Sequence, residues 1–91
     1  MSEQAMIPKL NSMFRFQYEK AQGCHVLLFP EGMVKLNDSA SEIIKLIDGN
    51  SSVEQIVNLL AAQFPEAGDL TDDVAEFLIT AVEKKWVYYG D

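Results

Sequence analysis

The sequence contains few of the residues that carry metal and covalent chemistry. Among 91 residues it has one cysteine, Cys24, and one histidine, His25. A single cysteine excludes an internal disulfide and any metal site built from several thiolates. The lone histidine lies in an apolar run, and the chain lacks a multi-histidine site, a glycine-rich phosphate loop and a catalytic triad. We therefore expect no metal, no cofactor and no enzymatic activity.

Cationic residues and long apolar stretches are also scarce. Seven Lys and Arg stand against fourteen Asp and Glu, which gives a net charge of −7. Residues 37–91 carry three lysines and eleven carboxylates, so this part of the chain repels nucleic acid. No run approaches the roughly 20 apolar residues that span a bilayer, and the N-terminus lacks the basic start and apolar core of a secretory signal. We expect a cytoplasmic protein that binds neither nucleic acid nor a membrane.

The length of the chain suits one small domain with a modest core. Residues 1–12 show no hydrophobic periodicity and place Pro8 among polar residues, a composition typical of a mobile terminus. We predict a flexible N-terminal leader over residues 1–12, followed by a single domain over residues 13–91.

Three segments with the patterns of β-strands follow the leader. Residues 14–19 alternate between aromatic and polar, and residues 25–29 are nearly all apolar, which indicates a strand covered on both faces. Pro30 and Gly32 then occupy the second and fourth positions of a tight turn. Residues 33–36 run back with Val34 and Leu36 on one face. The pattern predicts an antiparallel meander whose last strand has an unpaired edge.

Three helices are predicted after the strands. Capping boxes at residues 39–42 and 51–54 open the first two, and Thr71 is the expected cap of the third. Pro65 ends the second helix. For the tail over residues 86–89 the pattern leaves three alternatives: a last short strand, a helix end or an aromatic flap. The core stripe of the first helix is expected to consist of Ala40, Ile43, Ile44 and Ile47.

The third helix has a wider apolar arc than one buried stripe requires. One row consists of Val74, Phe77, Leu78 and Ala81, and a second consists of Ala75, Leu78, Ile79, Val82 and Trp86. So wide an arc must contact two things. In one interpretation, one row packs on the sheet and the first helix and the other contacts a partner. In the alternative, both rows pack internally against the first and second helices.

The order of these elements predicts an α+β, winged helix-turn-helix-like fold, with a three-stranded antiparallel sheet followed by three helices. The run LLFPEGMVKLNDSASEIIKLIDG, followed by SSVEQIVNLL and DDVAEFLITAVEKKWV, resembles the PqqD family over residues 14–87. The resemblance implies a peptide chaperone of pyrroloquinoline quinone (PQQ) biosynthesis, a recognition element for a ribosomally made precursor. Such a domain binds the leader region of the precursor peptide PqqA and presents it to the radical S-adenosylmethionine enzyme PqqE, which performs the chemistry.

A peptide site is predicted at the open strand edge and the neighbouring third helix. An extended peptide can add to such an edge as a further strand, held by main-chain hydrogen bonds. We expect the edge to be formed by residues 33–36 and the apolar wall by the exposed row of the third helix, with lysines at the margin that meet peptide carboxylates. The predicted site residues are Met33, Val34, Lys35, Leu36, Phe77, Leu78, Ala81 and Lys85.

Three other functions stay open at this point. A winged helix-like fold also suits DNA binding, although the third helix opens with Asp72, Asp73 and Glu76, whose charge repels phosphates. The chain can also be a PqqD-like module that serves another modified peptide. Finally, the unpaired edge can pair with its own symmetry mate in a homodimer.

Overall fold

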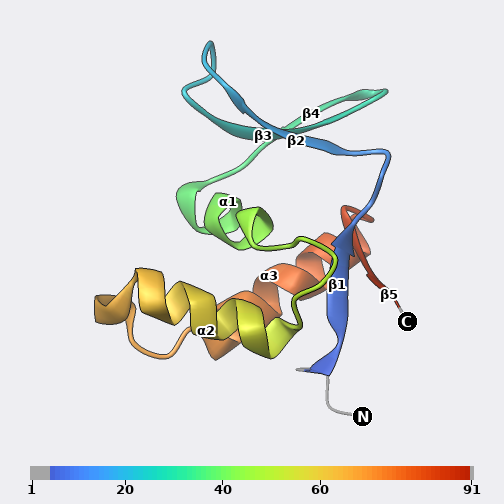
Figure 1. The fold of residues 1–91 in the computed structure, drawn as a ribbon. Helices are drawn as coiled ribbons and strands as arrows, with labels where there is room; N and C mark the ends of the chain where they lie inside the picture. The colour runs from blue at the N-terminus through green and yellow to red at the C-terminus, as the bar shows by residue number, and fades with distance from the viewer. Residues whose placement is uncertain (1–4, 91) are drawn as a thin grey trace.

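The computed structural model describes residues 5–90. These residues form a three-stranded sheet, three α-helices and a two-stranded sheet (Figure 1). The predicted α+β fold is confirmed. The strands are β1 (Ile7–Leu10), β2 (Arg15–Glu19), β3 (Cys24–Phe29), β4 (Gly32–Lys35) and β5 (Val87–Gly90). The helices are α1 (Asp38–Lys45), α2 (Val53–Gln63) and α3 (Thr71–Glu83), with a short 3-10 helix η2 (Pro65–Ala67) between the last two.

The three-stranded sheet is the predicted meander, in the order β2-β3-β4. Val26 and Leu27 are consecutive residues of β3, so their side chains point to opposite faces, and both are 0% exposed. This confirms a central strand covered on both faces. Phe29 and Gly32 are register partners, so Pro30 and the residue after it form the two-residue turn between β3 and β4.

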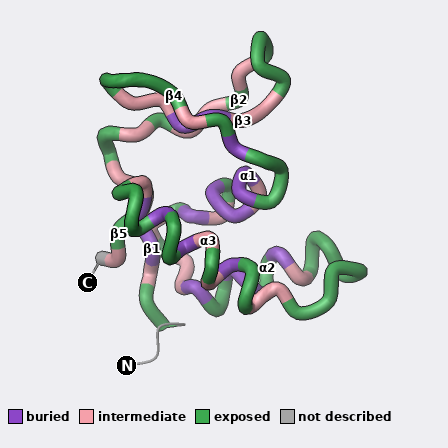
Figure 2. Tube along the Cα trace, turned by 180° about the vertical axis from the view of Figure 1, so that it is seen from behind, coloured by how far each residue is buried: buried purple, intermediate pink, exposed green. Residues whose placement is uncertain are grey.

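Helix α1 packs beneath the sheet through the predicted stripe, because Ala40, Ile43, Ile44 and Ile47 are all buried (Figures 1 and 2). Its start differs from the prediction. The Oδ1 atom of Asn37 accepts a hydrogen bond from the Ala40 N–H at 2.8 Å, so the capping box at residues 39–42 is wrong. Asparagine is among the best N-caps, and with Asn37 in that role Ser39 lies within the helix.

The caps of α2 and α3 are also displaced from their predicted positions. Ser52 caps α2 in a reciprocal capping box with Gln55, one residue beyond the predicted box. At α3 the Asp69 Oδ1 atom accepts hydrogen bonds from the Thr71 N–H at 2.9 Å and the Thr71 hydroxyl at 2.6 Å. Thr71 is therefore the first residue of α3 and not its cap. The end of α2 before Pro65 is confirmed.

Strands β1 and β5 tie the two ends of the described chain together. They pair antiparallel, with Ile7 opposite Gly90 and Leu10 opposite Val87. The Met6 carbonyl also accepts a hydrogen bond from the Val53 N–H at 2.9 Å, which fastens this sheet to the start of α2. The prediction of a flexible leader is therefore wrong for residues 7–10, and residues 1–4 lie outside the described residues. Of the three alternatives for the tail, the strand is observed.

The C-terminal end of α3 carries an unusual backbone conformation. Lys85 has a φ of 66°, in the left-handed region that favours glycine. Its N–H donates to the Val82 carbonyl at 3.0 Å, and the Trp86 N–H donates to the Ala81 carbonyl at 2.9 Å. These two hydrogen bonds form a Schellman motif with a lysine in the place where glycine is usual. The motif turns the chain sharply and sets the position of Trp86.

The main core lies between the lower face of the sheet, α1 and the inner sides of α2 and α3, where the buried positions gather in Figure 2. Leu27, Ile56, Val74 and Leu78 are at its centre. None of the helices in the described part of the chain is long and apolar enough to cross a membrane.

Candidate functional site

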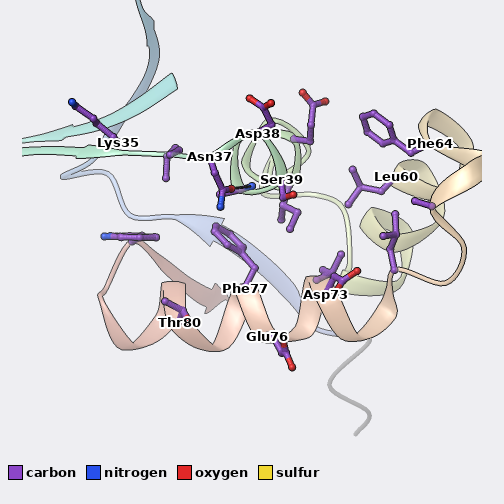
Figure 3. Close-up of a pocket in the computed structure, with 18 residues that line it drawn as sticks. Lys35, Asn37, Asp38, Ser39, Leu60, Phe64, Asp73, Glu76, Phe77 and Thr80 are labelled. Carbon is purple, nitrogen blue, oxygen red and sulfur yellow. Dashed lines mark hydrogen bonds between the residues drawn. The ribbon is translucent and has the colours of Figure 1, made fainter. Parts of the chain in front are cut away.

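A groove of ≈ 760 Å³ opens between the end of β4, the first turns of α1 and one flank of α3 (Figure 3). Its apolar lining comes largely from residues that belong to the core, so the floor of the groove is the outer surface of the core. This apolar lining includes Leu36, Ala40, Ile43, Leu60 and Val74.

Aromatic rings line both ends of this groove. Phe77 and Trp86 lie with their ring centroids 6.3 Å apart and their planes inclined by 41°, and both are half-buried. Figure 3 shows Phe77 pointing up from α3 toward Asn37 and the start of α1, with Phe64 at the far end near Leu60. The Schellman motif fixes the backbone position of Trp86, so the ring pair of Phe77 and Trp86 at this end of the groove is held in place by backbone hydrogen bonds.

The outer edge of β4 leads into the groove and presents unpaired backbone groups. The Leu36 N–H donates to the His25 carbonyl at 3.0 Å, and hydrogen-bonded pairs alternate along an antiparallel ladder. The pairing register then turns the Val34 amide toward β3. It turns the amides and carbonyls of Met33 and Lys35 away from β3. In residues 5–90, β4 pairs with β3 alone and β5 pairs with β1, so the chain's own last strand leaves this edge open.

The structure brings three of the eight predicted site residues into the groove, namely Lys35, Leu36 and Phe77. Met33 and Val34 lie farther back along β4 and do not line it, although Met33 is 41% exposed. Their expected role stays a prediction that concerns the strand edge.

The other three predicted residues, Leu78, Ala81 and Lys85, lie elsewhere. Leu78 and Ala81 are 1% and 0% exposed, so the prediction that they form an exposed row is wrong. They share the buried stripe of α3 with Val74, and Phe77 lies on the flank beside that stripe. Lys85 is exposed beyond the end of α3 and does not line the groove.

Several groove residues were missed by sequence reasoning because they come from segments far apart in the chain. The sequence did contain an indication for Trp86, because this residue ends the second apolar row of α3. It contained none for Asn37 and Thr80, because polar residues at a helix start and on a helix flank are ordinary. Ile79 of the second row is 56% exposed, but its helical angle places it on the flank opposite Phe77, away from the groove.

The charged residues that line the groove are mostly acidic. Asp38 and Glu42 lie on α1, while Asp73 and Glu76 lie on α3, and we call these four side chains the acidic rims. Glu42 forms an ion pair with Lys45 at 2.8 Å. Among the lining residues in the described part of the chain, Lys35 is the single cation. The groove is thus apolar in its depth and negative along its margins.

Two carboxyl groups outside the groove have perturbed acidity. Hydrogen bonds from the hydroxyl and N–H of Thr71 hold the pKa of the Asp69 carboxyl below its ordinary value. The backbone N–H groups of Asn50 and Ser51 lower the pKa of Asp48 in the same way. Both aspartates stabilise the loops that precede helices. In residues 5–90 no group of three or more His, Cys, Asp or Glu side chains is arranged to hold a metal ion.

Comparison with known proteins decides the family. Residues 24–87 match the family model described as coenzyme PQQ synthesis protein D, PqqD. The chain belongs to the PqqD family. It is 53% identical over 89 residues to a PqqA binding protein of Azotobacter vinelandii, covering 96% of this chain and 97% of that one. It is also 53% identical over 81 residues to a PqqA binding protein of Pseudomonas aeruginosa, covering 89% and 88%.

Solved structures of PqqD proteins share the fold. The chain is similar to the solution structure of the PqqD truncation of Methylobacterium extorquens PqqCD, with a TM-score of 0.76 and 27% identity over 96% of this chain and 93% of that one. That protein is described as a stand-alone recognition element for ribosomally synthesized and post-translationally modified peptides. The crystal structure of PqqD from Xanthomonas campestris is 34% identical, with a TM-score of 0.55 and coverage of 94% and 96%. The winged helix-turn-helix description of this fold stays a prediction.

Proposed function

We propose that this PqqD-family chain binds the precursor peptide PqqA and acts as its chaperone in PQQ biosynthesis. Relatives at 53% identity that span nearly the whole chain are named PqqA binding proteins, and this supports the proposal. The structural observation that carries it is an unpaired strand edge that runs into an apolar groove.

Strand addition is the binding mode that this geometry favours. The outward N–H and C=O groups of Met33 and Lys35 offer two donors and two acceptors to an extended peptide. Such bonds recognise any sequence, so selectivity must come from side chains that alternate into the groove. An apolar peptide side chain that reaches Phe77 and Trp86 leaves water and gains affinity by burial.

The bound peptide is then presented to a separate enzyme, the radical S-adenosylmethionine enzyme PqqE. This chain contributes no chemistry to that step. It raises the local concentration of PqqA at the enzyme by holding both in one ternary complex. A homodimer through β4 would occupy the same edge, so peptide and self-association are expected to compete.

Proline substitution at the strand edge tests this binding mode. Met33→Pro and Lys35→Pro each remove one outward N–H donor, and proline is tolerated at an edge position whose amide faces solvent. A lost hydrogen bond is worth about 0.5–1.5 kcal/mol, so affinity for PqqA should fall about 2- to 13-fold by isothermal titration calorimetry. Met33→Ala separates the loss of the side chain from the loss of the donor.

A matched control lies at the opposite edge of the sheet. His25 bonds to β4 at Leu36, so its β2 partner Tyr18 turns its amide to the outer edge of β2. Tyr18→Pro should leave PqqA affinity unchanged, with folding of every variant checked by circular dichroism. Unchanged affinity in both β4 variants would refute strand addition at this edge. Failure of the wild type to bind PqqA would refute the function itself and favour another modified peptide.

A further inference from the structure

The depth and the margins of the groove have different chemistry, and the margins restrict which peptide segment fits. A peptide that lies along the groove places its apolar side chains against Phe77 and the core residues beneath. Its remaining side chains project to the acidic rims on either side. Asp38 and Glu42 form one rim and Asp73 and Glu76 the other.

Three of the four rim carboxylates are available to a guest. Within residues 5–90, Glu42 has an ion-pair partner in Lys45, whereas Asp38, Asp73 and Glu76 form no ion pair with the chain's own lysines or arginine. In Figure 3 the carboxylates of Asp38 and Glu76 lie at opposite margins and point away from the apolar lining. Opposite charges on a guest would meet these groups at the partly screened surface.

The position of Lys35 gives the groove a direction. Lys35 lies at the β4 end, whereas the carboxylates lie beside α1 and α3. A cationic segment is therefore attracted to the part of the groove between the two helices and is repelled from the β4 end. Along β4 itself the contacts are the sequence-independent backbone hydrogen bonds of strand addition.

We infer that the groove selects a guest peptide segment in which Lys or Arg residues flank an apolar side chain. The cationic residues meet the acidic rims and the apolar residue contacts Phe77. The remainder of the peptide continues along the edge of β4. This inference rests on the proposed function for its location, and it names the chemical class of peptide that the same site takes.

The acidic residues at the start of α3 can also be explained by stabilisation of the helix dipole, and the neighbouring residue Asp72 allows this role to be distinguished from a role in the groove. Asp72 and Asp73 both lie in the first turn of α3, where either carboxylate stabilises the helix through its dipole. Only Asp73 lines the groove. Neutralising Asp72 therefore removes the same charge and the same helix contribution without touching the rims.

The test uses three blocked, labelled dodecapeptides that alternate Val with Lys, Gln or Glu, measured by fluorescence anisotropy. We expect affinity to decrease in the order Lys, Gln, Glu. In the rim variant Asp38→Asn/Asp73→Asn/Glu76→Gln, the Lys peptide should bind about 10- to 100-fold more weakly, at about 2- to 5-fold for each carboxylate. Its affinity should also lose most of its dependence on salt.

A charge-matched control distinguishes the rims from the overall negative charge. The variant Glu54→Gln/Asp72→Asn/Glu83→Gln changes the net charge equally at exposed residues outside the groove, and should change the affinity for the Lys peptide by less than about 2-fold. Equal effects in the two triple variants, or equal binding of the Lys and Gln peptides, would overturn the inference. If PqqA fails to bind while the Lys peptide shows the rim effect, the proposed function fails and the inference stands.

Discussion

Replacing Lys85 by glycine is predicted to stabilise this protein. Lys85 is the one residue other than glycine in the described chain with a positive φ, 66°, and it occupies the glycine position of a Schellman motif. Its side chain is exposed and forms no ion pair within residues 5–90. The lysine therefore bears the cost of a left-handed backbone, and no ion pair in residues 5–90 offsets that cost.

The size of the gain follows from two opposing terms. A left-handed conformation costs an L-residue with a side chain about 1–2 kcal/mol, and glycine avoids most of this. Glycine is also more flexible in the unfolded chain, and this lowers the free energy of unfolding by about 0.5–1 kcal/mol. A net stabilisation of about 0.5–1 kcal/mol is expected, which is about 2–8 °C in Tm for a domain of this size.

Urea unfolding monitored by circular dichroism measures this difference. Lys85→Gly should raise the midpoint with an unchanged slope, whereas Lys85→Ala should give no such gain because alanine keeps the steric penalty. Lys84 provides the matched control, since its φ of −85° suits any residue, and Lys84→Gly should destabilise by about 0.5–1 kcal/mol. A lower midpoint for Lys85→Gly would refute the reasoning and show that the lysine side chain itself supports the fold.

The remaining predictions concern caps, core, pH and the groove. Asn37→Ala should cost about 1 kcal/mol in urea unfolding, whereas Asn37→Asp keeps the cap of α1. Ile56→Ala, at a fully buried position, should cost about 2–5 kcal/mol by thermal unfolding. Because the pKa of Asp48 is lowered in the folded state, its carboxylate stabilises the fold at pH values above the ordinary carboxyl pKa, and this contribution is lost as the pH falls through the lower folded-state pKa. The free energy of unfolding of Asp48→Asn should therefore depend less on pH in the acid range than that of the wild type. Phe77→Ala should weaken PqqA binding by calorimetry, whereas Val82→Ala on the opposite flank of α3 should not.

Each of these predictions has a contradicting result. Equal stability of the alanine and aspartate variants at Asn37 would exclude its role as a cap. A cost below about 1 kcal/mol at Ile56 would mean that the core collapses around the cavity. Parallel acid titrations of the wild type and Asp48→Asn would contradict the pKa argument. Equal effects at Phe77 and Val82 would mean that the groove does not hold the peptide.

The local pattern of the sequence predicted the helices and the meander, because each depends on neighbouring residues. The period of 3.6 identified all four buried residues of the α1 stripe, and Pro30 marked the turn of the last hairpin. The caps were displaced because several residues near each helix start can serve, as with Asn37 and Ser39. The final choice depends on how the preceding strand enters the helix, which local pattern does not contain.

The site was less predictable than the fold. The row of Val74, Leu78 and Ala81 was rightly read as apolar, but periodicity alone does not say which side of a wide arc is covered by neighbouring helices. The groove joins β4 with α3, which are separated by the whole of α1 and α2. Its shape therefore depends on packing over a long sequence distance. The amide orientation of Val34 required the pairing register and could not be predicted from the alternation of side chains.

The pairing of β1 with β5 has a consequence for how the protein is made. Strand β1 leaves the ribosome well before its partner β5, because residues 11–86 lie between them in the chain. Translation proceeds at about 5–20 residues per second, so β1 waits about 4–16 s for β5 to emerge. During that interval the meander and α1 can already assemble, because their contacts are local in the chain. Strand β1 gains its partner only after β5 has been made.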